Sequence, residues 1–231
     1  MQLLIASTST VYGSSYLGYL EQPAKQHFSG CKKILFVPFA RAGGLSWHDY
    51  TAKAAAVFIT WGFQMKGAHE YKSPAEALSW ADGIFTGGGN TFLLLKTIYE
   101  GGWFDALQKE VLNGKPYMGT SAGSNICGIS IGSTNDMPIV QPPSLQAMGW
   151  ISFNLNPHYL DPLLDSTHMG ETREERIKEF HYFNEQPVLG LREGSYLLVN
   201  GDRITLEGPH TARLFRAKQE PVEIGNGPLN L

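Results

Sequence analysis

Runs of apolar residues, each about as long as a β-strand, recur through the first half of the chain. They occupy 3–7 (LLIAS), 33–40 (KILFVPFA), 62–69 (GFQMKGAH), 81–89 (ADGIFTGGG) and 115–119 (KPYMG). The segments between them, such as 15–28, 49–61 and 91–100, have a helical pattern. Continuous apolar runs that alternate with helices are typical of a parallel sheet covered on both faces. The pattern therefore predicts an α/β fold with a mostly parallel sheet flanked by helices.

The pattern changes after residue 130. Residues 130–160 are rich in Pro, Asn and Ser, and 172–180 (TREERIKEF) has the pattern of a helix. The segment 187–215 consists of short apolar runs separated by Gly and Asn-Gly, with VNGD at 199–202 as the clearest hairpin turn. We expect one domain over 1–231 with a short antiparallel section near the C-terminus.

Charge and cysteine content restrict the class of protein. The net charge is −3 and no dense Lys/Arg cluster is present, so we expect no binding to nucleic acid. With only Cys31 and Cys127, the chain has no disulfide framework, which favours a reducing compartment and a cytoplasmic protein. The first apolar run lacks a basic leader and is too short for a signal peptide or a membrane span. We therefore expect no association with membranes.

The segment GTSAG at 119–123 offers the first candidate for catalysis. It fits the G-x-S-x-G elbow, in which a nucleophilic serine stands on a sharp turn between a strand and a helix, and an apolar run precedes it. The same residues could form an ordinary turn. Cys127 lies six residues beyond Ser121, outside the elbow where a thiol-dependent amidotransferase would need it.

A serine nucleophile needs a base and a group that orients the base. His158 follows Pro157, which fixes the backbone at the end of an expected strand, whereas His168 is the competing base in a loop. Asp136 in a polar turn is the preferred acid, and Glu193 is the alternative. An α/β-hydrolase is disfavoured, because fifteen residues from 121 to 136 are too few for a crossover helix, a strand and a loop.

The segment GGGN at 87–90 supplies candidates for substrate binding. Three glycines let the backbone approach a ligand closely, and we expect the N–H groups of Gly89 and Ala122 to form an oxyanion hole. Asn90 is expected to contact the substrate. The Lys-Ser/Thr of a P-loop is missing after these glycines, and G-x-G-x-x-G does not fit.

The motifs GGGN, SAG, TNDMPIV, NPH and GETRE, in this order, resemble those of the peptidase E family, which comprises aspartyl dipeptidases related to cyanophycinases. The resemblance extends over essentially the whole chain. It implies a fold of the class I glutamine-amidotransferase type and a cytoplasmic enzyme that hydrolyses Asp-X dipeptides without a metal or other cofactor. By motif it implies that Ser121 is the nucleophile, His158 the base and Asp136 the acid, with Glu193 at a position that competes for the acid's role.

Arg173 is a candidate for recognising aspartate. Thr172 and Glu175 form a capping box, so Arg173 lies in the first turn of a helix, where a cation is unfavourable but could bind a carboxylate. Spacing alone favours a solvated arginine offset by Glu174, and the resemblance favours the carboxylate site. The alternatives to an Asp-X dipeptidase are a cyanophycinase-like hydrolase of β-aspartyl bonds and a catalytically silent binding module. Monomer and homodimer both remain open.

Overall fold

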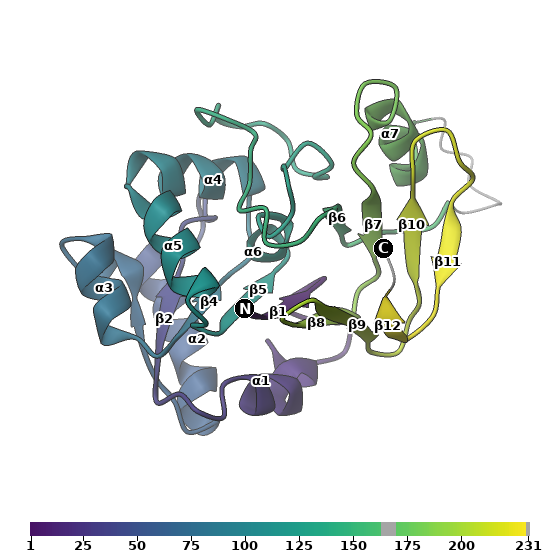
Figure 1. The fold of residues 1–231 in the computed structure, drawn as a ribbon. Coiled ribbons are helices and arrows are strands. Elements are labelled where there is room, and N and C mark those ends of the chain that lie inside the picture. The colour runs from purple at the N-terminus through teal and green to yellow at the C-terminus, as the bar shows by residue number, and fades with distance from the viewer. Residues whose placement is uncertain (163–169, 230–231) are drawn as a thin grey trace.

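Two β-sheets form the framework of the protein (Figure 1). The structure, a computed structural model, describes residues 1–162 and 170–229. The larger sheet has the strand order β12-β9-β8-β1-β5-β4-β2-β3. Its strands are β1 (Gln2–Ala6), β2 (Lys33–Val37), β3 (Gln64–Gly67), β4 (Gly83–Thr86), β5 (Tyr117–Thr120), β8 (Tyr196–Asn200), β9 (Arg203–Glu207) and β12 (Gly227–Leu229).

Five strands of the larger sheet, β1 to β5, run parallel, and β8, β9 and β12 extend it in antiparallel fashion. The hairpin between β8 and β9 turns at Gly201 and Asp202, with Asn200 opposite Arg203, as VNGD predicts. Gly201 has a φ of 60°, which glycine adopts without strain. The expected α/β class, with a mostly parallel sheet and an antiparallel C-terminal section, is confirmed.

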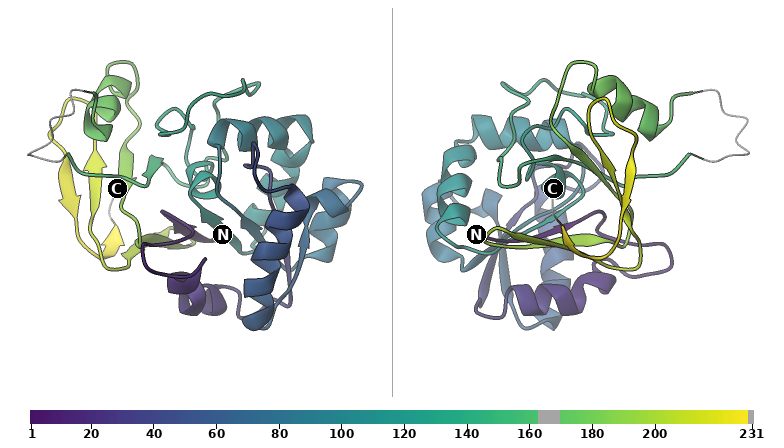
Figure 2. Two further views of the ribbon diagram at one scale, coloured as in Figure 1. Left: turned by 180° about the vertical axis from the view of Figure 1, so that it is seen from behind. Right: turned by 45° about the vertical axis from the view of Figure 1, so that its right-hand side comes forward.

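Helices cover both faces of the larger sheet (Figures 1 and 2). Apart from two 3-10 turns, η1 (Gly18–Leu20) and η2 (Ala68–Glu70), the helices are α1 (Glu21–His27), α2 (Trp47–Thr60), α3 (Pro74–Trp80), α4 (Thr91–Glu100), α5 (Trp103–Leu112), α6 (Ala122–Asn125) and α7 (Arg173–Phe180). None of the helices among the described residues is both long and apolar enough to cross a membrane.

The continuous apolar runs of the sequence result from burial on both sides of the sheet. Along β1, Leu3 and Ile5 face the core beneath α3, α4 and α5, whereas Leu4 and Ala6 face the core beneath α1 and α2. Because successive side chains of a strand point to opposite faces, a strand in this position needs apolar residues throughout.

A smaller sheet with the order β11-β10-β7-β6 stands to one side of the larger one, with α7 beside it (Figures 1 and 2). Its strands are β6 (Asn154–Pro157), β7 (Val188–Leu191), β10 (Ala212–Phe215) and β11 (Val222–Ile224). Strands β6 and β7 are parallel, so their carboxyl ends, Pro157 and Leu191, lie side by side. The residues that follow these two strands are therefore neighbours in space.

Candidate active site

Ser121 lies in a sharp turn between β5 and α6. Its backbone has φ 53° and ψ −111°, which is uncommon for a residue with a side chain. The turn is held on both sides, because the Ser121 N–H donates to the Ala6 carbonyl at 3.2 Å and the Ser121 carbonyl accepts from the Asn125 N–H at 2.9 Å. The turn has the strand–turn–helix context of a nucleophile elbow.

Close approaches of the backbone explain the glycines on both sides of Ser121. A Cβ atom at Gly119 would lie 2.4 Å from the carbonyl oxygen of Gly123, and one at Gly123 would lie 2.2 Å from that of Thr86. A Cβ atom at Gly88 would lie 3.0 Å from Ser121 Cβ. These glycines allow the elbow to pack tightly against β4 and against the GGGN loop.

His158 follows β6 and faces Ser121 with its ring. The separation of His158 Nε2 from Ser121 Oγ is 2.9 Å. Like Ser121, His158 has a positive φ, at 56°, and its backbone N–H donates to the hydroxyl of Ser7 at 2.9 Å. Ser7 directly follows β1, is fully buried and donates in turn to the carbonyl of Leu191 at 2.7 Å. The Ser7 side chain therefore joins the ends of β1, β6 and β7.

Glu193 is the carboxylate that contacts His158. It lies in the turn between β7 and β8, and its Oε1 is 2.6 Å from His158 Nδ1. A carboxylate only accepts hydrogen bonds, so this contact favours the proton on Nδ1 and leaves Nε2 to accept from the Ser121 hydroxyl. Half of the Glu193 side chain is exposed. Ser121, His158 and Glu193 thus form one continuous hydrogen-bonded chain.

Asp136, the acid preferred from the sequence, has other partners. Its Oδ2 accepts from the backbone N–H of Thr91 at 2.7 Å, at the start of α4, and its own N–H donates to the Thr134 hydroxyl at 3.2 Å. A carboxylate is favourable at this end of a helix because the N–H groups there have no helical partners. Among the described residues, Asp136 makes no hydrogen bond to His158, contrary to the expectation from the sequence. The carboxylate beside His158 Nδ1 is that of Glu193.

Asn90 is the N-cap of α4. Its Oδ1 accepts from the Leu93 N–H at 3.0 Å, and its Nδ2 donates to the Met137 carbonyl at 2.8 Å. Both ends of the Asn90 side chain therefore hold protein groups, and the residue fastens the loop that carries Asp136. The expectation that Asn90 contacts substrate receives no support from these contacts.

The GGGN loop passes beside the elbow. Gly89 has a φ of 147°, and a Cβ atom there would lie 2.2 Å from the Ala40 carbonyl oxygen, so only glycine fits. The Tyr50 hydroxyl supports the loop by donating to the Gly88 carbonyl at 3.2 Å. Within residues 1–162 and 170–229, neither the Gly89 N–H nor the Ala122 N–H donates to a protein acceptor. Both groups are thus available to a ligand.

A cavity of about 230 Å³ opens at Ser121. It is lined by Thr91, Ser121, Ala122, Asn125, Thr134, Asn135, Asp136, Pro157, His158 and Arg173. It is smaller than the roughly 300–1,000 Å³ of sites that take drug-sized ligands. The lining is polar and carries charged groups of both signs.

Arg173 brings a cation into this cavity. It is the first residue of α7, and the capping box between Thr172 and Glu175 is present as the sequence predicts. Its Nη1 is buried and has no hydrogen-bond acceptor within residues 1–162 and 170–229, and burial lowers the pKa of its guanidinium. A buried cationic donor without a partner is costly unless a ligand supplies the acceptor.

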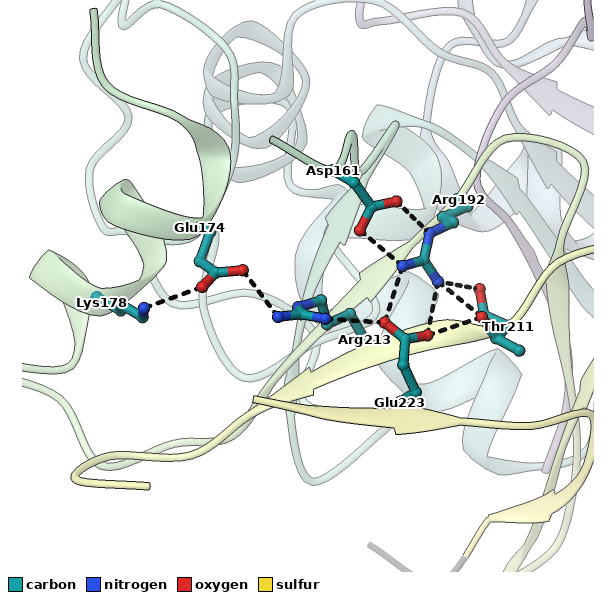
Figure 3. Close-up of polar contacts among 7 residues, drawn as sticks. All are labelled: Asp161, Glu174, Lys178, Arg192, Thr211, Arg213 and Glu223. Carbon is teal, nitrogen blue, oxygen red and sulfur yellow. Dashed lines mark hydrogen bonds and ion pairs between the residues drawn. The ribbon is translucent and has the colours of Figure 1, made fainter. Parts of the chain in front are cut away.

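A network of ion pairs connects α7 with the smaller sheet (Figure 3). Arg192 donates to both oxygens of Asp161 at 2.7 Å, and it contacts both oxygens of Glu223 at 2.9 and 3.0 Å. Arg213 lies 3.1 Å from Glu223 and 3.1 Å from Glu174. Lys178 and Thr211 complete the network through Glu174 and Glu223, respectively.

The network holds the neighbours of two site residues. Arg192 precedes Glu193, and Glu174 follows Arg173. Glu223 on β11 contacts both arginines of the network, so it connects the turn after β7 with the first turn of α7. The neighbours of Glu193 and Arg173 are therefore linked to the same carboxylate, Arg192 directly and Glu174 through Arg213.

The alternative base His168 lies outside the described residues. No group of three or more His, Cys, Asp or Glu residues in the described part of the chain is arranged to hold a metal ion.

Sequence reasoning missed Ser7 and Asn125. Ser7 is the last residue of the first apolar run, and the carboxyl end of a central strand is where α/β sheets place functional groups. Asn125 stands four residues after Ser121, so a short helix after the elbow would return it toward the site. Neither feature of the sequence shows which group the side chain of Ser7 or Asn125 contacts.

Comparisons with known proteins show the family to which the sequence is related. The profile of peptidase family S51 matches residues 3–207. A protein named peptidase E from Streptomyces coelicolor is 47% identical over 228 residues, which cover 98% of this chain and 92% of the relative. A Drosophila melanogaster protein named "Probable alpha-aspartyl dipeptidase" is 44% identical over 219 residues, covering 93% and 90%.

The fold has solved counterparts as well. The crystal structure of a peptidase from an acI-B1 Actinobacterium superposes with a TM-score of 0.73, covering 98% of this chain and 95% of its own, at 15% identity. That identity establishes likeness of fold alone, whereas the family profile spans most of the sequence. On the match over residues 3–207 and the identity to peptidase E, the chain belongs to peptidase family S51.

Proposed function

We propose that the protein is a serine-type dipeptidase that hydrolyses dipeptides with an N-terminal aspartate, Asp-X. The observation that carries the proposal is the continuous contact from Ser121 Oγ through the His158 ring to Glu193. A serine hydroxyl becomes a competent nucleophile when a base is within reach and a third group orients that base. The substrate is inferred from the relatives named peptidase E and alpha-aspartyl dipeptidase.

In the first half-reaction, Ser121 Oγ attacks the carbonyl carbon of the aspartyl residue while its proton passes to His158 Nε2. The N–H groups of Gly89 and Ala122 donate to the oxyanion of the tetrahedral intermediate. The C–N bond then breaks as His158 returns the proton to the leaving amino group of residue X. An aspartyl ester remains on Ser121.

In the second half-reaction, water attacks the ester and gives a proton to His158 Nε2. The ester bond breaks, Ser121 recovers its proton from His158, and free aspartate is released. Glu193 keeps the proton of the neutral ring on Nδ1 and stabilises the imidazolium that forms twice in each cycle. Glu193 therefore takes the role first expected of Asp136.

Arg173 is the group that selects aspartate. The side-chain carboxylate of the first residue must lose water on entering the cavity, which is costly without a partner. A guanidinium compensates through charge-assisted hydrogen bonds that are often bidentate. The buried Nη1 of Arg173, which has no acceptor among the residues that the structure describes, supports this role.

Other properties fit a small-molecule hydrolase. Its partner is the dipeptide itself, and the net charge of −3 gives no electrostatic reason to bind nucleic acid. Both cysteines are free thiols, which suits a reducing compartment, so we place the enzyme in the cytoplasm.

The test is hydrolysis of a panel of Asp-X, β-Asp-X and Asn-X dipeptides by the wild type and by Ser121→Ala. We expect Asp-X to be the best substrate and Ser121→Ala to lose turnover by roughly 10³-fold or more. The exposed Ser29→Ala variant serves as the control and keeps wild-type rates. Preference for β-Asp-X would indicate a cyanophycinase-like hydrolase, and no hydrolysis at all would indicate a binding module.

A further inference from the structure

Asp136 is a carboxylate in the cavity without a cationic partner. One oxygen accepts from the Thr91 N–H, and no Lys or Arg among the described residues lies within ion-pair distance. Asp136 nevertheless lines the same cavity as Ser121. The hydrogen-bonded chain of Ser121, His158 and Glu193 does not use it, so its charge needs another explanation.

Asn125 supplies a second acceptor in the same cavity. The residue is 2% exposed, and its Oδ1 is buried with no donor in the described part of the chain. Nearly all buried polar atoms of proteins have a hydrogen-bond partner, so an unpartnered amide oxygen in a cavity points to a ligand that donates. Asp136 and Asn125 together provide acceptors for a positively charged donor.

The cavity thus combines two kinds of group. Arg173 offers a donor with a positive charge, whereas Asp136 and Asn125 offer acceptors, one of them negative. The first residue of an Asp-X dipeptide carries the complementary pair, a side-chain carboxylate and an α-ammonium group. The α-ammonium is bonded to the carbon next to the scissile carbonyl, so it must enter the cavity when Ser121 attacks.

We infer that Asp136, together with the Asn125 amide oxygen, binds the α-ammonium group of the substrate's first residue. The inference rests on the proposed function and adds a requirement to it, namely a free amino terminus. An acyl group on that nitrogen would remove the charge and leave the Asp136 carboxylate and Asn125 Oδ1 unpaired, which is costly in a small cavity. Selection for one unblocked aspartyl residue follows from these contacts.

A purely structural role for Asp136 makes a different prediction. If the carboxylate only caps α4, an asparagine in its place keeps the acceptor for the Thr91 N–H and should change little. Asp136→Asn therefore removes the charge while preserving the cap. For the same reason the variant is expected to fold.

The test compares Asp-X with succinyl-X, which lacks only the α-ammonium group. We expect the wild type to prefer Asp-X by roughly 10²-fold or more in kcat/KM. Asp136→Asn should lower this preference by at least about tenfold, through a loss on Asp-X and not on succinyl-X. The exposed turn variant Asp202→Asn removes the same charge elsewhere and should keep the wild-type preference.

An unchanged preference in Asp136→Asn, or an equal loss on both substrates, would overturn the inference while leaving an Asp-X dipeptidase intact. A second measurement does not need turnover. In the Ser121→Ala background, calorimetric binding of L-aspartate should exceed that of succinate, and adding Asp136→Asn should remove most of the difference. Equal binding of aspartate and succinate to Ser121→Ala would also refute the subsite. The failure of wild-type enzyme to cleave any Asp-X would instead refute the proposed function.

Discussion

At the scale of single residues, the two carboxylates of Glu193 and Asp136 have different hydrogen-bond partners. Glu193 lies 2.6 Å from His158 Nδ1, whereas Asp136 accepts from the start of α4. The hydrogen-bond partners of the two acids distinguish them, whereas both side chains carry the same carboxylate group. Substitutions of Glu193 and of Asp136 should therefore have different effects on the kinetics of hydrolysis.

We expect Glu193→Gln to lower kcat by roughly 10³- to 10⁴-fold for Asp-X and succinyl-X alike. Glutamine keeps the shape of the side chain, but its amide can donate to Nδ1 and so stabilises the wrong tautomer of His158. Steady-state kinetics on folded protein at the pH optimum give the comparison. A larger loss of kcat in Asp136→Asn than in Glu193→Gln would return the acid's role to Asp136.

Arg173→Met should reduce kcat/KM for Asp-X by roughly 10²-fold or more, with little change for Asn-X. Methionine keeps much of the aliphatic bulk and removes the charge that pairs with the substrate carboxylate. Lysine should restore only part of the activity, because it is a point charge without the planar fork. The quantity to measure is the Asp-X to Asn-X ratio. If Arg173→Met leaves that ratio unchanged, aspartate is recognised elsewhere.

The conformation around single residues was predictable where it depends on neighbours in the sequence. The elbow at Ser121 and the cap before Arg173 are local, because each depends on glycines or on a capping residue within a few positions. The choice between Asp136 and Glu193 is not local, since it depends on how the loop after α6 meets α4. No spacing in the sequence encodes that contact.

At the scale of elements, the ion-pair network attaches α7 to the smaller sheet. Glu223 on β11 contacts Arg192 and Arg213, and these contacts lower its pKa to about 2, with the Arg192 hydrogen bond as the largest cause. A carboxyl group with a lower pKa in the folded state stabilises the fold at pH values above its unfolded pKa of roughly 4.3. This stabilisation disappears as the pH falls from there toward 2.

Glu223→Gln should therefore lower Tm at neutral pH, with the difference from wild type shrinking between about pH 4.5 and pH 2. Because the side chain is 44% exposed, added salt should also reduce the difference. Thermal unfolding at several pH values measures both effects, with the exposed Glu185→Gln as the matched control. A Tm difference that is constant from pH 7 to pH 2 would contradict the assignment.

Elements were predictable from the apolar runs because burial on both faces leaves a clear signal. The runs at 3–7, 33–40, 62–69, 81–89 and 115–119 each overlap a strand of the larger sheet. The smaller sheet was harder to foresee, since β6 is four residues long and lies in a segment rich in Pro, Asn and Ser. Its pairing with β7 joins residues that are far apart in the chain.

At the scale of the whole molecule, the site is assembled from both sheets. Ser121 follows a strand of the larger sheet, whereas His158 follows a strand of the smaller one, and Glu193 lies in the turn that leads from one sheet to the other. Ser7 connects them, because its hydroxyl accepts from the His158 N–H and donates to the Leu191 carbonyl. The relative position of the sheets therefore determines the distance between nucleophile and base.

Ser7→Ala should lower the free energy of unfolding by about 1–3 kcal/mol, because the His158 N–H loses its acceptor and the Leu191 carbonyl loses one of its donors. It should also lower kcat by more than tenfold, since His158 loses the contact that holds its left-handed backbone. The control is Ser133→Ala, which removes a buried hydroxyl bonded to the Leu155 carbonyl without touching the triad. Denaturant unfolding and kcat are measured for both variants. A similar loss of kcat in both variants would rule out a specific role for Ser7.

The origin of the site in two sheets has a consequence for a chain that is still being synthesised. The ribosome releases Ser121 well before Glu193, and the turn that carries Glu193 is held between β7 and β8, both of which form from the last quarter of the sequence. Strand β8 must also pair with β1, which is made long before it, before the Ser195 carbonyl can accept from the Ser7 N–H. A nascent chain that stops short of Glu193 therefore lacks the contact from Glu193 to His158, and we expect no hydrolysis until β8 has been made and has paired with β1.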